Sequence, residues 1–230
     1  MGPEPFMRKI TTTLARSLAL VLLAVVACPA QDVHPVTKRR IAQVMGPGGA
    51  DWLVRPERVE EEHPDQALDA LKIAKGSTVA DIGAGVGYFS WRLAERVGSD
   101  GVVYAEDIQQ VMLDMLDRNM KARKLSNVRP VLGTIDDPKL PRDSVDLILL
   151  VDVYHEFSEP QKMLARMRES LKPGGRLVLL EYRGEDPNVP IKVEHKMTVK
   201  QVRAELEPAQ LKFVESIEIL PQQHILVFRK

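Results

Sequence analysis

The segment Asp81–Gly87 constrains the fold of this chain most, because glycine recurs in it at every second position from Gly83 to Gly87. A short apolar run precedes it and an amphipathic stretch follows, as in a strand, a tight loop and a helix. Glycine accepts positive φ angles and has no Cβ, so a ligand can approach such a loop closely. The N–H groups at the start of the following helix suit a carboxylate or a phosphate. The segment therefore predicts a ligand-binding loop.

Short apolar runs and amphipathic stretches alternate through the chain after residue 64. Parallel strands need a crossover, which is usually a helix, so this order predicts an α/β fold with a mostly parallel sheet and helices on both faces. The predicted strands are 78–82, 102–106, 128–132, 145–151, 176–181, 212–219 and 224–228. The predicted helices are 64–73, 88–97, 109–122, 160–171 and 198–206.

The last two predicted strands break this alternation, because only four residues, 220–223, separate them. That link is too short for a crossover helix, so the two strands are antiparallel if they pair. The sequence thus predicts a C-terminal hairpin.

Length and composition limit the class of protein. A chain of 230 residues suits one α/β domain, and 44% apolar with 28% charged residues is ordinary for a soluble globular protein. Lys and Arg total 32, as do Asp and Glu, so the net charge gives no indication of a nucleic-acid partner.

The glycine spacing separates two kinds of cofactor. The dinucleotide fingerprint G-x-G-x-x-G, started at Gly83, needs a glycine where the chain has Tyr88, and started at Gly85 it meets Ser90. This spacing disfavours a nicotinamide-dependent oxidoreductase, which stays open as an alternative. The pattern acid-x-G-x-G-x-G that begins at Asp81 resembles motif I of the class I S-adenosylmethionine-dependent methyltransferases.

Further segments resemble the same family in the same order. Residues 103–108 are similar to its "VYAxDI" pattern, residues 140–148 to its "LP…SFD" passage, and residues 171–177 to its "LKPGG" turn. The resemblance covers about residues 52–230 and implies a seven-stranded Rossmann-like sheet. It also implies S-adenosylmethionine as cofactor, S-adenosylhomocysteine as product and a small-molecule acceptor. A non-catalytic cofactor-binding protein of this fold is a further alternative.

The resemblance also implies residue roles. Asp81 would hold the ammonium of the methionine part, Asp107 the ribose hydroxyls and Ile108 the adenine, with Glu106 secondary. The family's frequent Asp after the glycine at residue 133 is Thr134 here, so Asp136 or Asp137 would replace its adenine contact. The complete predicted cofactor set is Asp81, Gly83, Ala84, Gly85, Gly87, Tyr88, Asp107, Ile108, Thr134, Ile135, Asp136 and Asp152.

Two side chains after strand 145–151 are the catalytic candidates. His155 has an ordinary pKa near neutrality and could act as a general base; alternatively, it orders the loop or contacts the cofactor. Tyr154 could line the acceptor pocket or pack in the core.

Substrate candidates lie in two segments. The polar stretch 182–197 is long enough for a lid and contains Tyr182, His195 and Lys196. Arg55 and Arg58 could hold an anionic acceptor. Alternatively, all five side chains lie on the solvated surface, where the two arginines form ion pairs with nearby glutamates.

No metal site is predicted, because the spacing of His63, His155, His195 and His224 matches no ligand pattern such as H-E-x-x-H. Cys28 is the only cysteine, so the sequence predicts no disulfide.

The first thirty residues resemble an export signal. Arg8, Lys9 and Arg16 precede the apolar run 18–28, which at 11 residues is shorter than the roughly 20 that span a bilayer. The end of the run, at Cys28, is similar to a bacterial lipobox. We therefore expect a signal peptide or a membrane or lipid anchor at 1–30, with an exported (periplasmic) or membrane-attached protein. The alternative location is the cytoplasmic face of the membrane, where the cofactor is available.

The predicted organisation has three parts: the leader 1–30, a linker 31–50 with Pro35 and Pro47, and a methyltransferase domain 51–230. A helical cap occupies about 51–75 of that domain. The sequence gives no indication of the oligomeric state.

Overall fold

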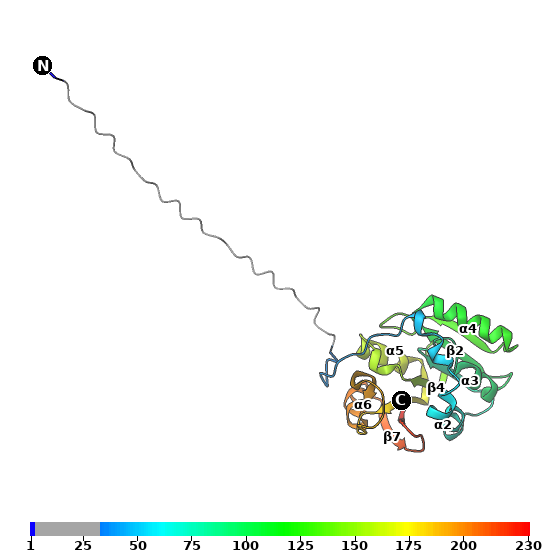
Figure 1. Ribbon diagram of the computed structural model, residues 1–230. Helices are drawn as coiled ribbons and strands as arrows, with labels where there is room; N and C mark the ends of the chain where they lie inside the picture. The colour runs from blue at the N-terminus through cyan, green and yellow to red at the C-terminus, as the bar shows by residue number, and fades with distance from the viewer. Residues whose placement is uncertain (3–32) are drawn as a thin grey trace. The chain divides into compact units, whose positions relative to one another are not determined.

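The computed structural model describes residues 1–2 and 33–230. Residues 33–230 contain an eight-stranded sheet with helices on both faces (Figure 1). The leader predictions, including that for Cys28, fall outside the described residues. Among those described, no helix is both long and apolar enough to span a bilayer.

The sheet confirms the predicted fold class. Its order is β3-β2-β1-β4-β5-β8-β7, with β1 to β5 parallel and β8 antiparallel to both β5 and β7. A two-residue strand, β6, pairs with β5 off this path. The strands are β1 (Thr78–Ile82), β2 (Val102–Asp107), β3 (Val128–Leu132), β4 (Val145–Val151), β5 (Leu171–Arg183), β6 (Lys196–Met197), β7 (Lys212–Ile217) and β8 (Gln223–Arg229).

The main helices lie close to where the apolar periodicity predicts them. They are α2 (Pro64–Ala70), α3 (Ser90–Val97), α4 (Gln110–Ala122), α5 (Pro160–Ser170) and α6 (Val199–Leu206), with a short α1 (Arg58–Glu62) in the predicted cap. Thr198 caps α6, since its side chain and that of Gln201 each accept from the other's backbone N–H.

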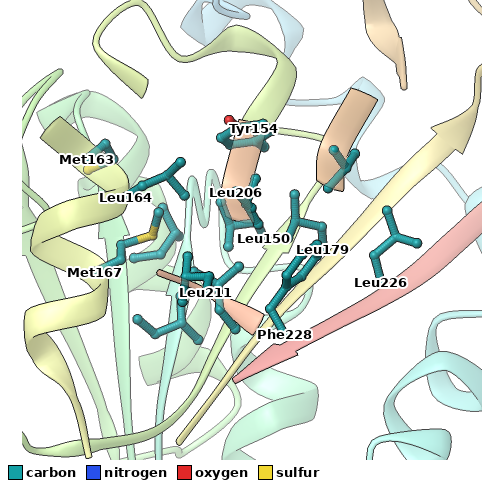
Figure 2. Close-up of a cluster of buried hydrophobic side chains, with 14 of the residues drawn as sticks. Leu150, Tyr154, Met163, Leu164, Met167, Leu179, Leu206, Leu211, Leu226 and Phe228 are labelled. Carbon is teal, nitrogen blue, oxygen red and sulfur yellow. The ribbon is translucent and has the colours of Figure 1, made fainter. Parts of the chain in front are cut away.

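Both faces of the sheet are buried, as β4 illustrates. Ile148 and Leu150 point into a cluster with α5 and α6, and Leu147 and Leu149 point into a second cluster with α2 and α3. Side chains alternate along a strand, so a strand covered on both faces reads as a continuous apolar run. Figure 2 shows the first cluster.

β5 begins five residues before the predicted strand. Val145 pairs with Leu171 and Leu147 with Arg176, so the "LKPGG" turn is an irregularity within the strand pairing. Gly174 there has a φ of 77°, which glycine adopts without steric cost.

Residues 33–50 were predicted to be a linker, but in the structure they pack against the domain. His34 and Ala42 are buried, and the Ala42 N–H donates to the His155 carbonyl at 3.0 Å. Arg39 pairs with the buried Glu205 of α6 at 2.9 Å. The segment packs because it buries Ile41 and Ala42 and because it supplies partners to a buried carboxylate.

Candidate active site

A cavity of about 350 Å³ lies at the carboxyl ends of β1, β2 and β4. The sheet order reverses between β1 and β4, and ligands of open α/β sheets bind at this switch point. The volume falls within the range of small-molecule sites. Apolar side chains form much of its wall: Val44, Met45, Trp52, Leu53, Ile108, Met112, Ile135, Phe157, Met163 and Ile191.

The glycine loop forms the cavity's edge at the end of β1. Gly83 and Gly85 have φ angles of 66° and 54°. A Cβ on Gly83 would lie 2.3 Å from Val153 Cγ2, and one on Gly85 would lie 2.9 Å from Leu53 Cδ1. Both positions favour glycine for conformation, and Gly83 also requires it for space because the β-branched Val153 lies so close.

Two acids at the end of β2 face this loop. Asp107 Oδ2 accepts from the Gly85 N–H at 2.9 Å, and its Oδ1 accepts from the Gln109 N–H at 2.8 Å. Glu106 Oε2 lies 3.4 Å from the Gly83 N–H, while its buried Oε1 has no hydrogen-bond partner among the described residues. Burial, and then the nearby Asp107, raises the pKa of Glu106 to about 8. Such an oxygen is available to a ligand donor.

Asp81 lies behind the loop and does not line the cavity. Its Oδ2 accepts from the Ser90 hydroxyl at 2.6 Å, which ties the start of α3 to β1. Burial raises the pKa of Asp81 to about 7. Its role toward the cofactor's ammonium stays a prediction.

Asp152 follows β4 in a left-handed conformation, with a φ of 51°. Aspartate is among the residues that tolerate this region, and the turn leads the chain into the short helix η3 (Tyr154–Glu156). Asp152 Oδ2 accepts from Gln223 Nε2 at 2.7 Å, while the buried Oδ1 has no partner among the described residues. Burial, then the charge of Glu62, raises the pKa of Asp152 well above its ordinary value.

Arg58 and Tyr182, both predicted substrate residues, line the cavity beside Glu62. Arg58 Nε donates to Glu62 Oε2 at 2.8 Å, and the Tyr182 hydroxyl donates to Glu62 Oε1 at 3.3 Å. The Arg58 guanidinium also lies 4.3 Å from the Tyr88 ring centroid. The alternative of a surface ion pair is therefore wrong for Arg58, which is 5% exposed.

Arg55 and Lys196 do not line the cavity. Arg55 pairs with Glu61, as the surface alternative predicts, and stacks 3.8 Å from the Trp52 ring centroid. Lys196 Nζ donates to the Asp186 carbonyl at 3.2 Å.

His155 lines the cavity between two partners. Its Nδ1 lies 2.6 Å from Glu181 Oε2, and its Nε2 lies 3.1 Å from His195 Nδ1. Burial lowers the pKa of His155, but the charge and hydrogen bond of Glu181 outweigh burial, so the pKa is raised. Burial and then the charge of His155 lower the pKa of His195.

Tyr154 packs in the core, which was one of its two predicted alternatives, and it does not line the cavity as the other alternative required. Its side chain is fully buried in the α5–α6 cluster, where Figure 2 shows it. Its hydroxyl lies 3.4 Å from His34 Nε2. The sequence could not foresee this contact, because His34 belongs to the segment predicted as a linker.

Several predicted cofactor residues lie beside the cavity, not on its wall. Ala84 and Tyr88 pack into the core, and a Cβ on Gly87 would meet Leu116 and Met120. Of the segment after β3, Ile135 lines the cavity, whereas Thr134 donates to Asp136 Oδ1 at 2.8 Å outside the wall. The predicted residues on the wall are Gly83, Gly85, Asp107, Ile108, Ile135, Asp152, His155, Arg58, Tyr182 and His195.

The fold also brings together residues that the sequence prediction did not single out. Glu156 lines the cavity beside His155, and Met45 reaches it from the N-terminal segment. One ligand atom from each of His155, Glu156 and His195 lies within 4.8 Å of the other two. The prediction of no metal site considered spacing along the chain, and it missed this group because His195 comes from a distant segment.

Comparison with known proteins indicates the same family that the sequence motifs resemble. A family model described as a methyltransferase domain matches residues 73–223. An uncharacterized methyltransferase of Mycobacterium tuberculosis (strain H37Rv) is 36% identical over 124 residues, which are 54% of this chain and 47% of that protein. A demethylmenaquinone methyltransferase of Geobacillus kaustophilus is 29% identical over 117 residues, or 51% and 50% of the two chains. The chain thus spans about half the length of the curated relatives it matches.

A solved structure extends the similarity to the fold of nearly the whole described chain. A SAM-dependent methyltransferase from Aquifex aeolicus superposes with a TM-score of 0.77 at 26% identity. The match covers 81% of this chain and 99% of that one.

Proposed function

Because the chain belongs to the methyltransferase-domain family, we propose that it is an S-adenosylmethionine-dependent methyltransferase whose acceptor is a small molecule bound in the cavity. One observation carries this proposal: the glycine loop is held open at the switch point by Asp107, beside buried carboxyl oxygens that have no partner among the described residues.

The residues of the cavity fit the cofactor. Asp107 would accept from the ribose hydroxyls, and Ile108 and Ile135 would pack on the adenine. Glu106 Oε1 and Asp152 Oδ1 would accept from the cofactor's remaining donors, which include an ammonium group. When bound, the cofactor supplies a methyl group on a positively charged sulfur, and the acids of the cavity complement that charge.

The chain's own contribution would be alignment. Methyl transfer is an in-line displacement, so the enzyme chiefly holds the acceptor atom and the methyl carbon in line and excludes water. Glu181 fixes the His155 ring on the wall, and Glu62 holds Arg58 and Tyr182 through hydrogen bonds to both. These residues are the candidates for orienting the acceptor.

Three observations support a small acceptor. The cavity is mostly apolar in lining, it has the volume of a small-molecule site, and the chain has no net charge that would attract nucleic acid. The Geobacillus relative is named for a quinone-type substrate, so a hydroxylated aromatic ring is a sensible first acceptor to test.

Transfer of a labelled methyl group tests the proposal. Purified protein is incubated with methyl-labelled cofactor and either small-molecule extract, a demethylated quinol, protein or RNA. At a cofactor concentration near the wild-type Kd, we expect label in a small-molecule fraction with the wild type and much less with Asp107→Ala. Label in protein or RNA alone would contradict the small acceptor, and no transfer to any fraction would contradict the enzyme.

A further inference from the structure

We infer that His155, Glu156 and His195 bind one divalent transition-metal ion on the wall of the cavity. Their ligand atoms lie within 4.8 Å of one another, and all three side chains line the cavity. Two histidines with one carboxylate are a known ligand set for divalent first-row metals, and this set leaves coordination positions open.

The distance between the two imidazoles suits adjacent ligands. His155 Nε2 and His195 Nδ1 are 3.1 Å apart. With metal–nitrogen bonds of about 2.1 Å, this separation subtends an angle of roughly 95° at the metal, which is the angle between neighbouring positions of an octahedron. The competing explanation is a hydrogen bond between the rings, in which one nitrogen donates a proton to the other.

Glu181 supplies an independent indication of a metal. It is fully buried and lies 2.6 Å from His155 Nδ1, and its other oxygen accepts from the Tyr154 N–H at 3.1 Å. Histidine ligands nearly always donate their second N–H to a carboxylate or carbonyl, which fixes the tautomer with the lone pair on the metal-binding nitrogen. Here that arrangement leaves His155 Nε2 facing His195 and the cavity.

The open coordination positions face the acceptor's space, so the site would take an oxygen atom of a bound ligand. This use rests on the proposed function, with an acceptor that carries an acidic hydroxyl such as a phenol or enol. Metal coordination lowers the pKa of the hydroxyl. Its proton passes to solvent, the oxygen forms a bond to the methyl carbon, and the carbon–sulfur bond breaks with its electron pair on sulfur.

Cobalt binding to the full chain tests the site. Chelator-treated protein is titrated with Co²⁺ and followed by visible absorption and calorimetry, then displaced with Zn²⁺. We expect one equivalent of Co²⁺ to bind per chain, with the visible absorption bands of Co²⁺ coordinated by nitrogen and oxygen ligands. A thiolate charge-transfer band would be absent, which separates this site from Cys28, the only cysteine.

Variants identify the ligands. His195 is only half-buried, so His195→Ala leaves the core intact and should weaken Co²⁺ binding by more than the roughly 10- to 100-fold loss expected from the supporting variant Glu181→Gln. Glu156→Gln, which keeps the side chain's shape, should also weaken it. His63→Asn is the matched control, since His63 lies outside the cavity wall with a φ of 48° that asparagine tolerates.

Equal Co²⁺ affinity in the wild type and His195→Ala, or no binding by either, would overturn the inference in favour of a hydrogen bond between the rings. Titration with S-adenosylmethionine in chelator separates the two proposals. If the protein binds the cofactor but not Co²⁺, only the metal site is contradicted. If the protein does not bind the cofactor, the proposed function is contradicted.

Discussion

Carboxyl groups dominate the chemistry of the cavity at the scale of single residues. Glu106 and Asp152 each present a buried oxygen without a partner among the described residues, and the two carboxyl oxygens of Asp107 accept from the backbone. Burial without compensation favours the protonated form of an acid. A ligand that donates hydrogen bonds and carries positive charge would pair with these oxygens and stabilise the ionised acids, so the cavity suits such a ligand.

Asp107→Ala should weaken S-adenosylmethionine binding about 10- to 100-fold, because hydrogen bonds to charged groups contribute about 1.5–3 kcal/mol. The sequence also predicts Asp136 as a cofactor residue, but it lies off the cavity wall, so Asp136→Asn is the control and should bind normally. Calorimetry on both variants checks this. Equal losses in the two would show that the cavity wall is not the binding surface.

The free energy of unfolding of the ligand-free protein should fall as pH rises from about 4.5 to 8. The folded-state pKa of Glu106 is raised to about 8, so between these values the folded state holds more protons than the unfolded state. Asp81, with a pKa raised to about 7, acts in the same direction. Urea denaturation across this range measures the slope, and Glu106→Gln should make it shallower; an unchanged slope would exclude Glu106 as a source.

At the scale of elements, the ends of β1 and β4 depend on each other. The glycine loop passes so close to the chain after β4 that a Cβ on Gly83 would lie 2.3 Å from Val153 Cγ2. A side chain added at Gly83 therefore has to displace Val153.

Gly83→Ala should destabilise the protein more than Gly76→Ala. Both glycines have positive φ, 66° and 76°, but a Cβ on Gly76 meets nothing within 4 Å. The control thus measures the conformational cost alone, roughly 1–2 kcal/mol. Urea denaturation compares the two, and equal losses would mean that the contact with Val153 is relieved without cost. Val153→Ala in the Gly83→Ala background should restore part of the stability.

The strands and helices were predictable because each has a local signal. β4 reads as a continuous apolar run from Leu147 to Val151 because both its faces are buried there, and α3 starts shortly after the glycine loop. Asp107, Ile108 and Asp152, which the sequence predicted as cofactor residues, all line the cavity. The contact between His155 and His195 had no local signal, because it depends on how the segment after β5 folds back over η3.

At the scale of the whole molecule, the N-terminal segment 33–50 belongs to the folded domain. Arg39 and His34 meet Glu205 of α6, and Val44 and Met45 contribute to the cavity wall. The sequence suggested a linker because prolines and glycines are frequent there, and burial of polar side chains has no periodic signature.

Arg39→Ala should cost about 3–5 kcal/mol, because it leaves the buried Glu205 without its main cation. Arg203→Ala removes the exposed ion pair between Arg203 of α6 and Glu207, the residue that follows this helix, and should cost at most about 1 kcal/mol. Denaturation of both variants checks the difference. Similar costs would show that residues 33–50 are not part of the cooperative fold.

Calorimetric titration of the purified protein with S-adenosylmethionine, S-adenosylhomocysteine and NADH tests the central claim most directly. The account predicts one equivalent of either adenosyl compound bound per chain, weakened by Asp107→Ala, and no binding of NADH. Binding of NADH in their place, or of none of the three by folded protein, would contradict it.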